Sequence, residues 1–172
     1  MADLVSDLID RVIAREGGFS DNAADAGGAT NWGITISTLR DWRREPVSVD
    51  DVRNLTVDEA KQIYRSRFFV ASGFDQVKDP QLLELLFDFA VNSGVYTATR
   101  ALQRCIGVKD DGAFGPLSAA ALRATNNYAA LFYKIKCERY ELLLRYIGFD
   151  HAQAIFATGW SNRLDQFDEK IN

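Results

Sequence analysis

Helical periodicity covers most of the chain and is interrupted once by a long polar segment. Apolar residues recur at the spacing of amphipathic helices. The helices are predicted at residues 3–15, 37–44, 57–69, 80–93, 95–106, 116–125, 126–147, 151–158 and 161–170. The interruption, Phe19 to Thr35, is too rich in glycine, aspartate and asparagine for a helix, and its turn signals predict an irregular β-hairpin or folded loop. The chain is therefore predicted to be mainly α-helical, with a small polar lobe after the first helix.

Local signals mark where several of these helices begin and end. Gly17-Gly18 stops the first helix, because glycine readily leaves the helical conformation. Ser37 is the predicted N-cap of the second helix. Thr56 and Glu59 have the spacing of a capping box, and Pro80 occupies the favoured first position of the helix that follows.

Composition narrows the class of protein. The chain has 172 residues, a length typical of one domain with a hydrophobic core. A net charge of -4 excludes a general attraction to nucleic acid or anionic membranes, so we expect no nucleic-acid partner. No stretch is long and apolar enough to span a bilayer. Because the N-terminus lacks the features of a signal peptide, we expect synthesis in the cytoplasm and arrival at any outside target by another route.

The two cysteines give no sign of a metal site. Cys105 and Cys137 lie among apolar and helix-forming residues, which predicts buried free thiols and leaves a disulfide open. No cluster of cysteine and histidine has the spacing of zinc ligands. We therefore expect no metal and no organic cofactor.

Glu16 is the first candidate catalytic residue. It follows an apolar helix directly and precedes two glycines, so packing is predicted to half-shelter its carboxyl group while a large ligand can approach. Desolvation favours the protonated form of a carboxyl group, which is what a general acid for glycoside cleavage needs. The alternative is a helix-terminal glutamate that simply faces water.

A second carboxylate in the polar segment favours the catalytic interpretation. Asp25 lies in a loop that can fold back over the end of the helix, and two carboxylates can divide the work of glycosidic cleavage. Thr30 and Asn31 add hydroxyl and amide groups that can hold a water molecule. All three residues are also ordinary turn formers, so a purely structural role stays open.

Four blocks of this sequence resemble one known family. The segment EGGFSDNAADAGGATNWGIT, residues 16–35, resembles the signature of glycoside hydrolase family 108, a family of bacterial and phage N-acetylmuramidases. FDFAVNSG at 87–94 resembles the second block of that family. DGAFGP at 111–116 and GWSNR at 159–163 resemble a segment described as peptidoglycan-binding. The blocks are spread over nearly the whole chain.

The resemblance implies a fold and a set of roles. It implies a lysozyme-like, mainly helical fold in a single compact domain, with a catalytic segment at 1–94 and a peptidoglycan-binding segment at 95–172. It implies that Glu16 is the catalytic acid. Phage-type lysozymes have a similar spacing from glutamate to aspartate, followed by a threonine. Thr30 stands one position closer than in that pattern.

Further residues are predicted to contact a glycan substrate. Sites for aminosugar chains combine aromatic surfaces with hydrogen-bonding groups. Trp32 is a candidate surface for stacking of a sugar ring, or alternatively a lid over the first helix. Trp160 is a candidate residue of the far wall of the substrate cleft. Asn92 and Ser93 end the helix after Pro80 and are predicted to line the cleft. Asp88, one turn before Asn92, is predicted to be structural.

The expected function is hydrolysis of the β-1,4 bond between N-acetylmuramic acid and N-acetylglucosamine in peptidoglycan. Two alternatives stay open: a lytic transglycosylase acting on the same bond, and a non-catalytic protein of wall binding or secretion. The resemblance together with the missing signal peptide favours a phage or prophage endolysin, which a holin releases to the wall and which acts as a monomer without inserting into the membrane.

Overall fold

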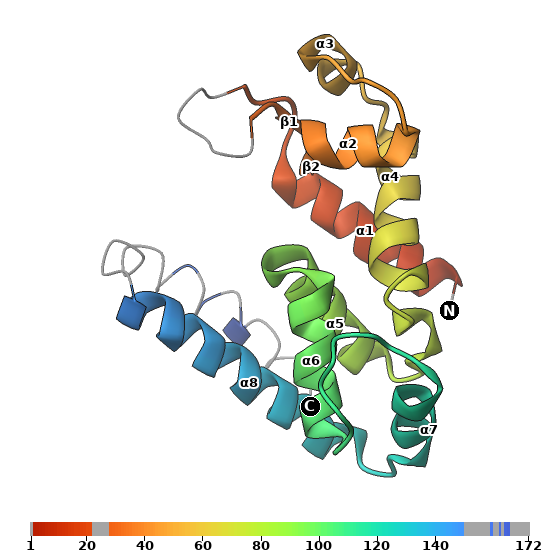
Figure 1. Ribbon diagram of the computed structural model, residues 1–172, viewed down its shortest axis with the longest axis vertical. Helices are drawn as coiled ribbons and strands as arrows, with labels where there is room; N and C mark the ends of the chain where they lie inside the picture. The colour runs from red at the N-terminus through yellow and green to blue at the C-terminus, as the bar shows by residue number, and fades with distance from the viewer. Residues whose placement is uncertain (1, 22–27, 150–158, 160–161, 163, 166–172) are drawn as a thin grey trace. The chain divides into compact units, whose positions relative to one another are not determined.

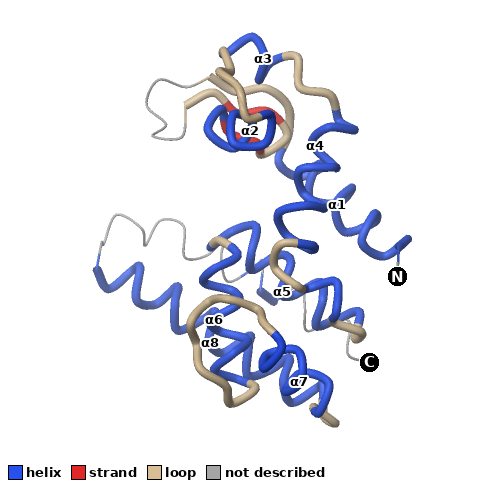
Figure 2. Tube along the Cα trace, turned by 45° about the vertical axis from the view of Figure 1, so that its right-hand side comes forward, coloured by secondary structure: helices blue, strands red, loops and turns tan. Residues whose placement is uncertain are grey.

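The computed structural model describes residues 2–21, 28–149, 159, 162 and 164–165. The chain divides into two compact units, residues 1–67 and 68–172, which are described separately. Helices make up most of the described chain, and the only strands drawn are one short pair beside the second helix (Figure 2). The prediction of a mainly helical protein with one small hairpin lobe is confirmed.

Unit 1 is built from four helices and a hairpin. Its elements are α1 (Ala2–Glu16), β1 (Thr30–Asn31), β2 (Ile34–Thr35), α2 (Ile36–Arg43), α3 (Val49–Arg53) and α4 (Val57–Tyr64). Helix α1 packs on α4 (Figure 1), because both carry a stripe of apolar residues at helical spacing. The buried residues of this interface include Leu8, Ile9, Val12, Ile13, Ala60, Ile63 and Tyr64.

The hairpin follows from two residues with positive φ. Strands β1 and β2 are antiparallel, and Asn31 pairs with Ile34. Between them, Trp32 and Gly33 have φ angles of 54° and 74°, which is the pattern of a type I′ turn. Such turns match the twist of two antiparallel strands and therefore favour a two-residue connection.

Two details of unit 1 differ from the sequence predictions. The N-cap of α2 is Thr35 and not Ser37, because the hydroxyl group of Thr35 accepts the main-chain N–H of Thr38. Helix α3 was not predicted. It begins at a full capping box in which the side chains of Ser48 and Asp51 each accept the other's main-chain N–H.

The start and end of α4 agree only in part with prediction. Thr56 caps α4 as expected, but the Glu59 side chain turns away to form a two-pronged ion pair with Arg43 of α2. Helix α4 ends at Tyr64, and a π-helix, η1 (Arg65–Val70), continues the chain where a single α-helix to Phe69 was expected.

Unit 2 centres on three helices that pack against one another. Its elements are η2 (Phe74–Gln76), α5 (Pro80–Ser93), α6 (Val95–Cys105), α7 (Pro116–Ala124) and α8 (Tyr128–Phe149). Helices α5, α6 and α8 share the core (Figure 1). A buried ion pair joins α5 to α8, with Asp88 Oδ2 at 2.7 Å from Arg139 Nη2. Asp88 is therefore structural, as predicted.

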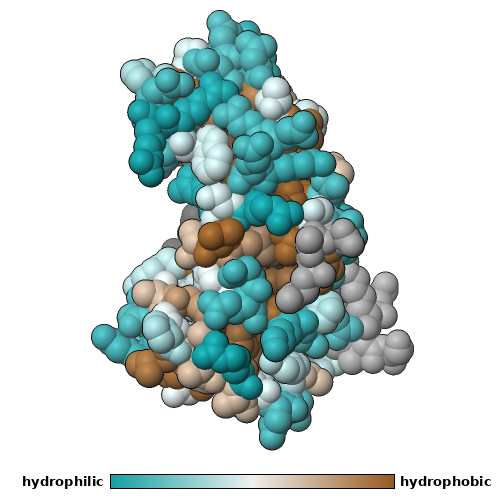
Figure 3. Space-filling model, turned by 90° about the vertical axis from the view of Figure 1, so that its right-hand side faces the viewer, coloured by the Kyte–Doolittle hydropathy of each residue, from teal (hydrophilic) through white to brown (hydrophobic). Residues whose placement is uncertain are grey.

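The surface differs in hydropathy between the parts seen in one view. Hydrophilic residues cover most of the upper part of the face in Figure 3, and hydrophobic residues reach the surface in several places below it. Among the described residues, no helix is long and apolar enough to cross a bilayer. Both cysteines are free thiols, but the prediction that both are buried is wrong: Cys105 is half-buried and Cys137, on α8, is exposed.

Candidate active site

Glu16 lies at the C-terminal end of α1, where its side chain is exposed. Glu16 continues the spacing of the buried stripe of α1, three residues after Ile13 and four after Val12, but its own side chain is exposed, so the half-sheltered position predicted for it is wrong. Within the described part of unit 1, the structure gives its carboxylate no hydrogen bond or ion pair. The chain then leaves the helix at Gly17, whose φ of 75° favours glycine. A carboxylate in this position is accessible to a large ligand.

The turn of the hairpin lies directly against the stem of Glu16. A Cβ atom added at Gly33 would stand 3.0 Å from Glu16 Cγ and would overlap the hydroxyl oxygen of Tyr64. The φ of 74° at Gly33 is a second reason why glycine is required there. Gly33 therefore allows a close approach of three elements: the end of α1, the hairpin turn and α4.

Trp32 is held at both its side chain and its main chain. Its Nε1 donates a hydrogen bond to the carbonyl oxygen of Leu55 at 3.3 Å. Its carbonyl oxygen accepts a hydrogen bond from the hydroxyl group of Tyr64 at 3.1 Å. The side chain of Trp32 is half-buried. The ring is thus fixed in place and keeps part of its surface exposed, which suits both a lid and a sugar platform.

Asn31 is placed as a structural residue. It is 4% exposed, and its Nδ2 donates to the carbonyl oxygens of Val52 and Arg53 at 3.0 and 3.1 Å. These bonds tie β1 to the end of α3. The buried Oδ1 atom has no hydrogen-bond partner among the described residues. Its role in substrate binding stays a prediction, and its burial does not favour that role.

Thr30 is brought to the same end of α1 as Glu16. Its main-chain N–H and carbonyl oxygen both pair with those of Ser20 at 2.8 Å, so the chain returns to a point four residues after Glu16. Asp25 lies outside the described residues. The structure therefore ties one of the two predicted partners, Thr30, to the segment that follows the acid, and its catalytic role stays a prediction.

The predicted substrate contacts on α5 belong to unit 2. Asn92 is exposed, and its Nδ2 donates to the carbonyl oxygen of Asp88 at 2.5 Å. Ser93 is half-buried at the last position of α5. Trp160 lies outside the described residues. These three assignments stay predictions.

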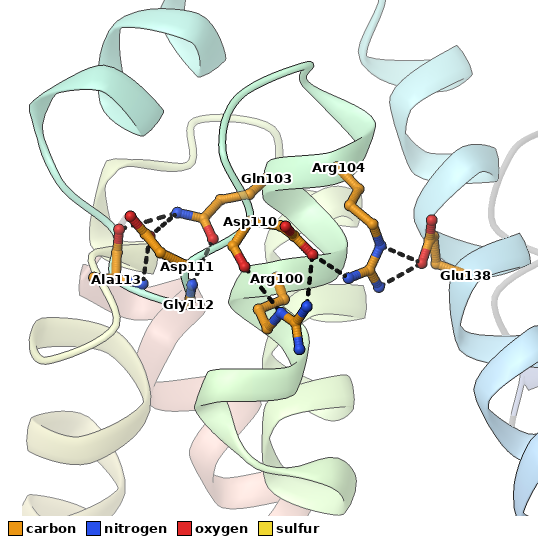
Figure 4. A network of polar contacts seen from close by, with 8 residues as sticks. All are labelled: Arg100, Gln103, Arg104, Asp110, Asp111, Gly112, Ala113 and Glu138. Atoms are coloured by element: carbon orange, nitrogen blue, oxygen red, sulfur yellow. Dashed lines mark hydrogen bonds and ion pairs between the residues drawn. The ribbon is translucent and has the colours of Figure 1, made fainter.

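A buried amide of α6 holds the loop at residues 111–116 in unit 2 (Figure 4). Gln103 is 1% exposed, and its Nε2 donates to Asp111 Oδ1 at 2.9 Å and to the carbonyl oxygen of Ala113 at 3.0 Å. Its Oε1 accepts the main-chain N–H of Gly112 at 2.8 Å. One side chain thus satisfies three polar groups of a sharp turn.

Two arginines of α6 clamp the residue before this loop (Figure 4). Arg100 Nη2 and Arg104 Nη1 lie 2.8 and 3.0 Å from Asp110 Oδ2, and Arg104 also pairs with Glu138 of α8 at 2.6 Å. Hydrogen bonds from Arg100 and Arg104 hold the pKa of the Asp110 carboxyl group below its ordinary value. These ion pairs connect the loop to α6 and α8, which indicates a structural role.

Tyr64 is the residue that the sequence analysis missed. It was not among the predicted site residues, although its hydroxyl group donates a hydrogen bond to the carbonyl oxygen of Trp32 in the hairpin turn. Gly33 was the available signal, because a glycine in a tight turn often marks a close approach by another element.

Among the described residues, no group of three or more Asp, Glu, His or Cys side chains is arranged to hold a metal ion.

Comparisons with known proteins cover both units. A family model described as Glycosyl hydrolase 108 matches residues 9–94, and one described as Predicted Peptidoglycan domain matches residues 97–165. A solved structure of Brucella abortus SagA is similar, with a TM-score of 0.83 and 29% sequence identity. The match covers 99% of this chain and 94% of that chain. A search of curated proteins found no match.

Proposed function

Because the chain belongs to glycosyl hydrolase family 108, we propose that it hydrolyses the β-1,4 bond between N-acetylmuramic acid and N-acetylglucosamine, with Glu16 as the general acid. The protein is a glycoside hydrolase that degrades peptidoglycan, and its fold is lysozyme-like. One observation carries the assignment of the acid: an exposed carboxylate at the end of α1 that lies against a glycine turn. This is the glutamate of the family's Glu-Gly-Gly block.

The proposed first step is proton transfer from Glu16 to the glycosidic oxygen. Loss of the sugar leaving group then creates positive charge on the remaining sugar ring. We propose that Asp25 orients the attacking water or stabilises that charge, and that Thr30 helps to hold the water. The position of Thr30 beside the Ser20 bridge, at the same end of α1 as the acid, supports its part.

The remaining predicted contacts complete the proposal. Trp32, fixed and half-exposed, provides a surface for a sugar ring. Asn31, Asn92, Ser93 and Trp160 are the further proposed contacts with the glycan. We propose no metal and no cofactor, because acid catalysis by carboxyl groups needs neither.

The test is mass analysis of soluble fragments released from purified peptidoglycan. The wild type is expected to release fragments with reducing muramic acid ends, while Glu16→Gln is expected to lose at least about 1,000-fold in rate, since the amide cannot donate the proton. Glu45→Gln, an exposed glutamate of unit 1, is the matched control and should keep full activity. Anhydro ends would assign a lytic transglycosylase instead. Full activity of Glu16→Gln would remove Glu16 as the acid.

We also propose that residues 1–94 carry the catalysis and residues 95–172 bind the wall. The ranges of the two family models support this division. Full-length Glu16→Gln is then expected to sediment with purified sacculi as the wild type does, and loss of sedimentation would argue against the division.

The biological setting is proposed from the family, which includes phage enzymes. We propose a monomeric endolysin of a phage or prophage that reaches the wall through a holin. Expression in a bacterial host should then cause lysis only together with a holin. Lysis without one would argue for another route of export.

A further inference from the structure

The conformation of Trp32 needs support from its surroundings. A φ of 54° is unfavourable for a residue with a large side chain, because the Cβ atom approaches the main-chain carbonyl oxygen. Such conformations persist where neighbouring groups fix them, and they concentrate at functional sites. Groups of neighbouring elements, outside the hairpin, must therefore hold the turn of Trp32 and Gly33 in this conformation.

Tyr64 supplies that support from the core of unit 1. Its side chain is 2% exposed and lies on α4 among fully buried residues such as Ala60 and Ile63. Its hydroxyl group donates to the carbonyl oxygen of Trp32 at 3.1 Å. A rigid aromatic ring anchored in packed protein thus fixes the main chain in the middle of the turn.

The same turn limits where Glu16 can point. The space where Gly33 would carry a Cβ atom is bordered by Glu16 Cγ at 3.0 Å, by Glu16 Cβ at 3.4 Å and by the hydroxyl oxygen of Tyr64. The stem of Glu16 therefore rests on the main chain of the turn. A shift of the turn changes the rotamers that are open to Glu16, and with them the direction of its carboxyl group.

We propose that Tyr64 is a positioning residue for the general acid: its hydroxyl group anchors the carbonyl oxygen of Trp32, and the turn then holds Glu16 towards the glycosidic oxygen. This inference rests on the proposed role of Glu16. Proton transfer needs the acid within hydrogen-bond reach of the leaving oxygen, and a displacement of about 1 Å can cost about 100-fold in rate. Tyr64 itself is buried and acts through the turn.

The first test is Tyr64→Phe, which keeps the ring and removes the hydroxyl group. We expect kcat on soluble peptidoglycan fragments to fall about 5- to 50-fold while KM changes less than about twofold, because orientation of the acid and not substrate binding is disturbed. Tyr140→Phe is the matched control. It removes a hydroxyl group that donates to Asp165 Oδ1 at 2.7 Å in unit 2, and its kcat should stay within about twofold of the wild type.

A purely structural role of Tyr64 gives a different result. Tyr64→Phe would then unfold at a lower temperature but would keep the wild-type kcat well below that temperature, and this outcome would overturn the proposal. Glu16→Gln, measured on the same substrate, separates the two inferences. If Glu16→Gln is inactive while Tyr64→Phe is fully active, only the positioning role fails; if Glu16→Gln is active, the proposed function fails with it.

A second variant keeps the proposal testable if Tyr64→Phe does not fold. Gly33→Ala places a methyl group that overlaps the Tyr64 hydroxyl oxygen and stands 3.0 Å from Glu16 Cγ, whereas Gly107→Ala adds a similar backbone strain at a φ of 75° with nothing within 4 Å. We expect kcat to fall at least about 10-fold in Gly33→Ala and less than about twofold in Gly107→Ala. Equal values of kcat in the two folded variants would contradict the positioning role.

Discussion

The buried ion pair between α5 and α8 allows a prediction of magnitude. Asp88 and Arg139 are 4% and 3% exposed, and their charged atoms lie 2.7 Å apart. The change Asp88→Asn keeps the shape of the side chain but leaves the guanidinium group buried without its anionic partner. Removing one partner of a buried pair costs about 3–5 kcal/mol. The ring of Phe89, with its centroid 5.3 Å from the guanidinium carbon, still stabilises the cation, so we expect about 3 kcal/mol.

The assay is urea unfolding at pH 7, followed by circular dichroism. The free energy of unfolding of Asp88→Asn should fall by about 3 kcal/mol, with little change in the slope. Glu141→Gln on the same helix is the matched control. Its ion pair with Arg145 is 3.5 Å long and more than half exposed on both sides, so its removal should cost less than about 0.5 kcal/mol.

The refuting result is a loss below about 1 kcal/mol for Asp88→Asn, which would mean that water or another group neutralises the buried guanidinium group. The double variant Asp88→Leu with Arg139→Met should recover part of the loss, because an apolar pair of similar size removes both charges of the pair. A double variant less stable than Asp88→Asn would show that the pair is worth more than the packing that replaces it.

Two further predictions follow from ionisable groups of unit 2. The hydrogen bonds from Arg100 and Arg104 depress the folded-state pKa of Asp110, so their stabilising effect is present above the ordinary carboxyl pKa and is lost as the pH falls through the lowered value. Thermal unfolding between pH 6 and pH 2 should show this loss, and Asp110→Asn should show a smaller one; an equal loss in both proteins would contradict the assignment. Burial raises the pKa of the Cys105 thiol to about 11, whereas Cys137 is exposed. At pH 8 an aromatic disulfide reagent should therefore modify one thiol quickly and the other only slowly, and Cys137→Ser should abolish the fast reaction; a fast reaction that survives in Cys137→Ser would refute the assignment.

The helices and their caps were largely predictable because their signals are local. The apolar stripe of α1, the cap at Thr56 and Pro80 at the first turn of α5 each depend on residues within one or two turns. The misplaced cap of α2 shows the limit of such signals. Thr35 and Ser37 are both good caps, and the hairpin that delivers the chain to Thr35 decides between them.

The sequence by itself determined that this chain forms amphipathic helices around a polar hairpin, and it singled out Glu16 from its place at a helix end before two glycines. The resemblance to one family came from the same residues. Only the tertiary structure decided that Glu16 is exposed, that Asn31 is buried beneath α3 and that the hydroxyl group of Tyr64 meets the turn at Gly33. Helix formation depends on neighbours along the chain, whereas these contacts join residues up to 32 positions apart, and their geometry is set when the core packs.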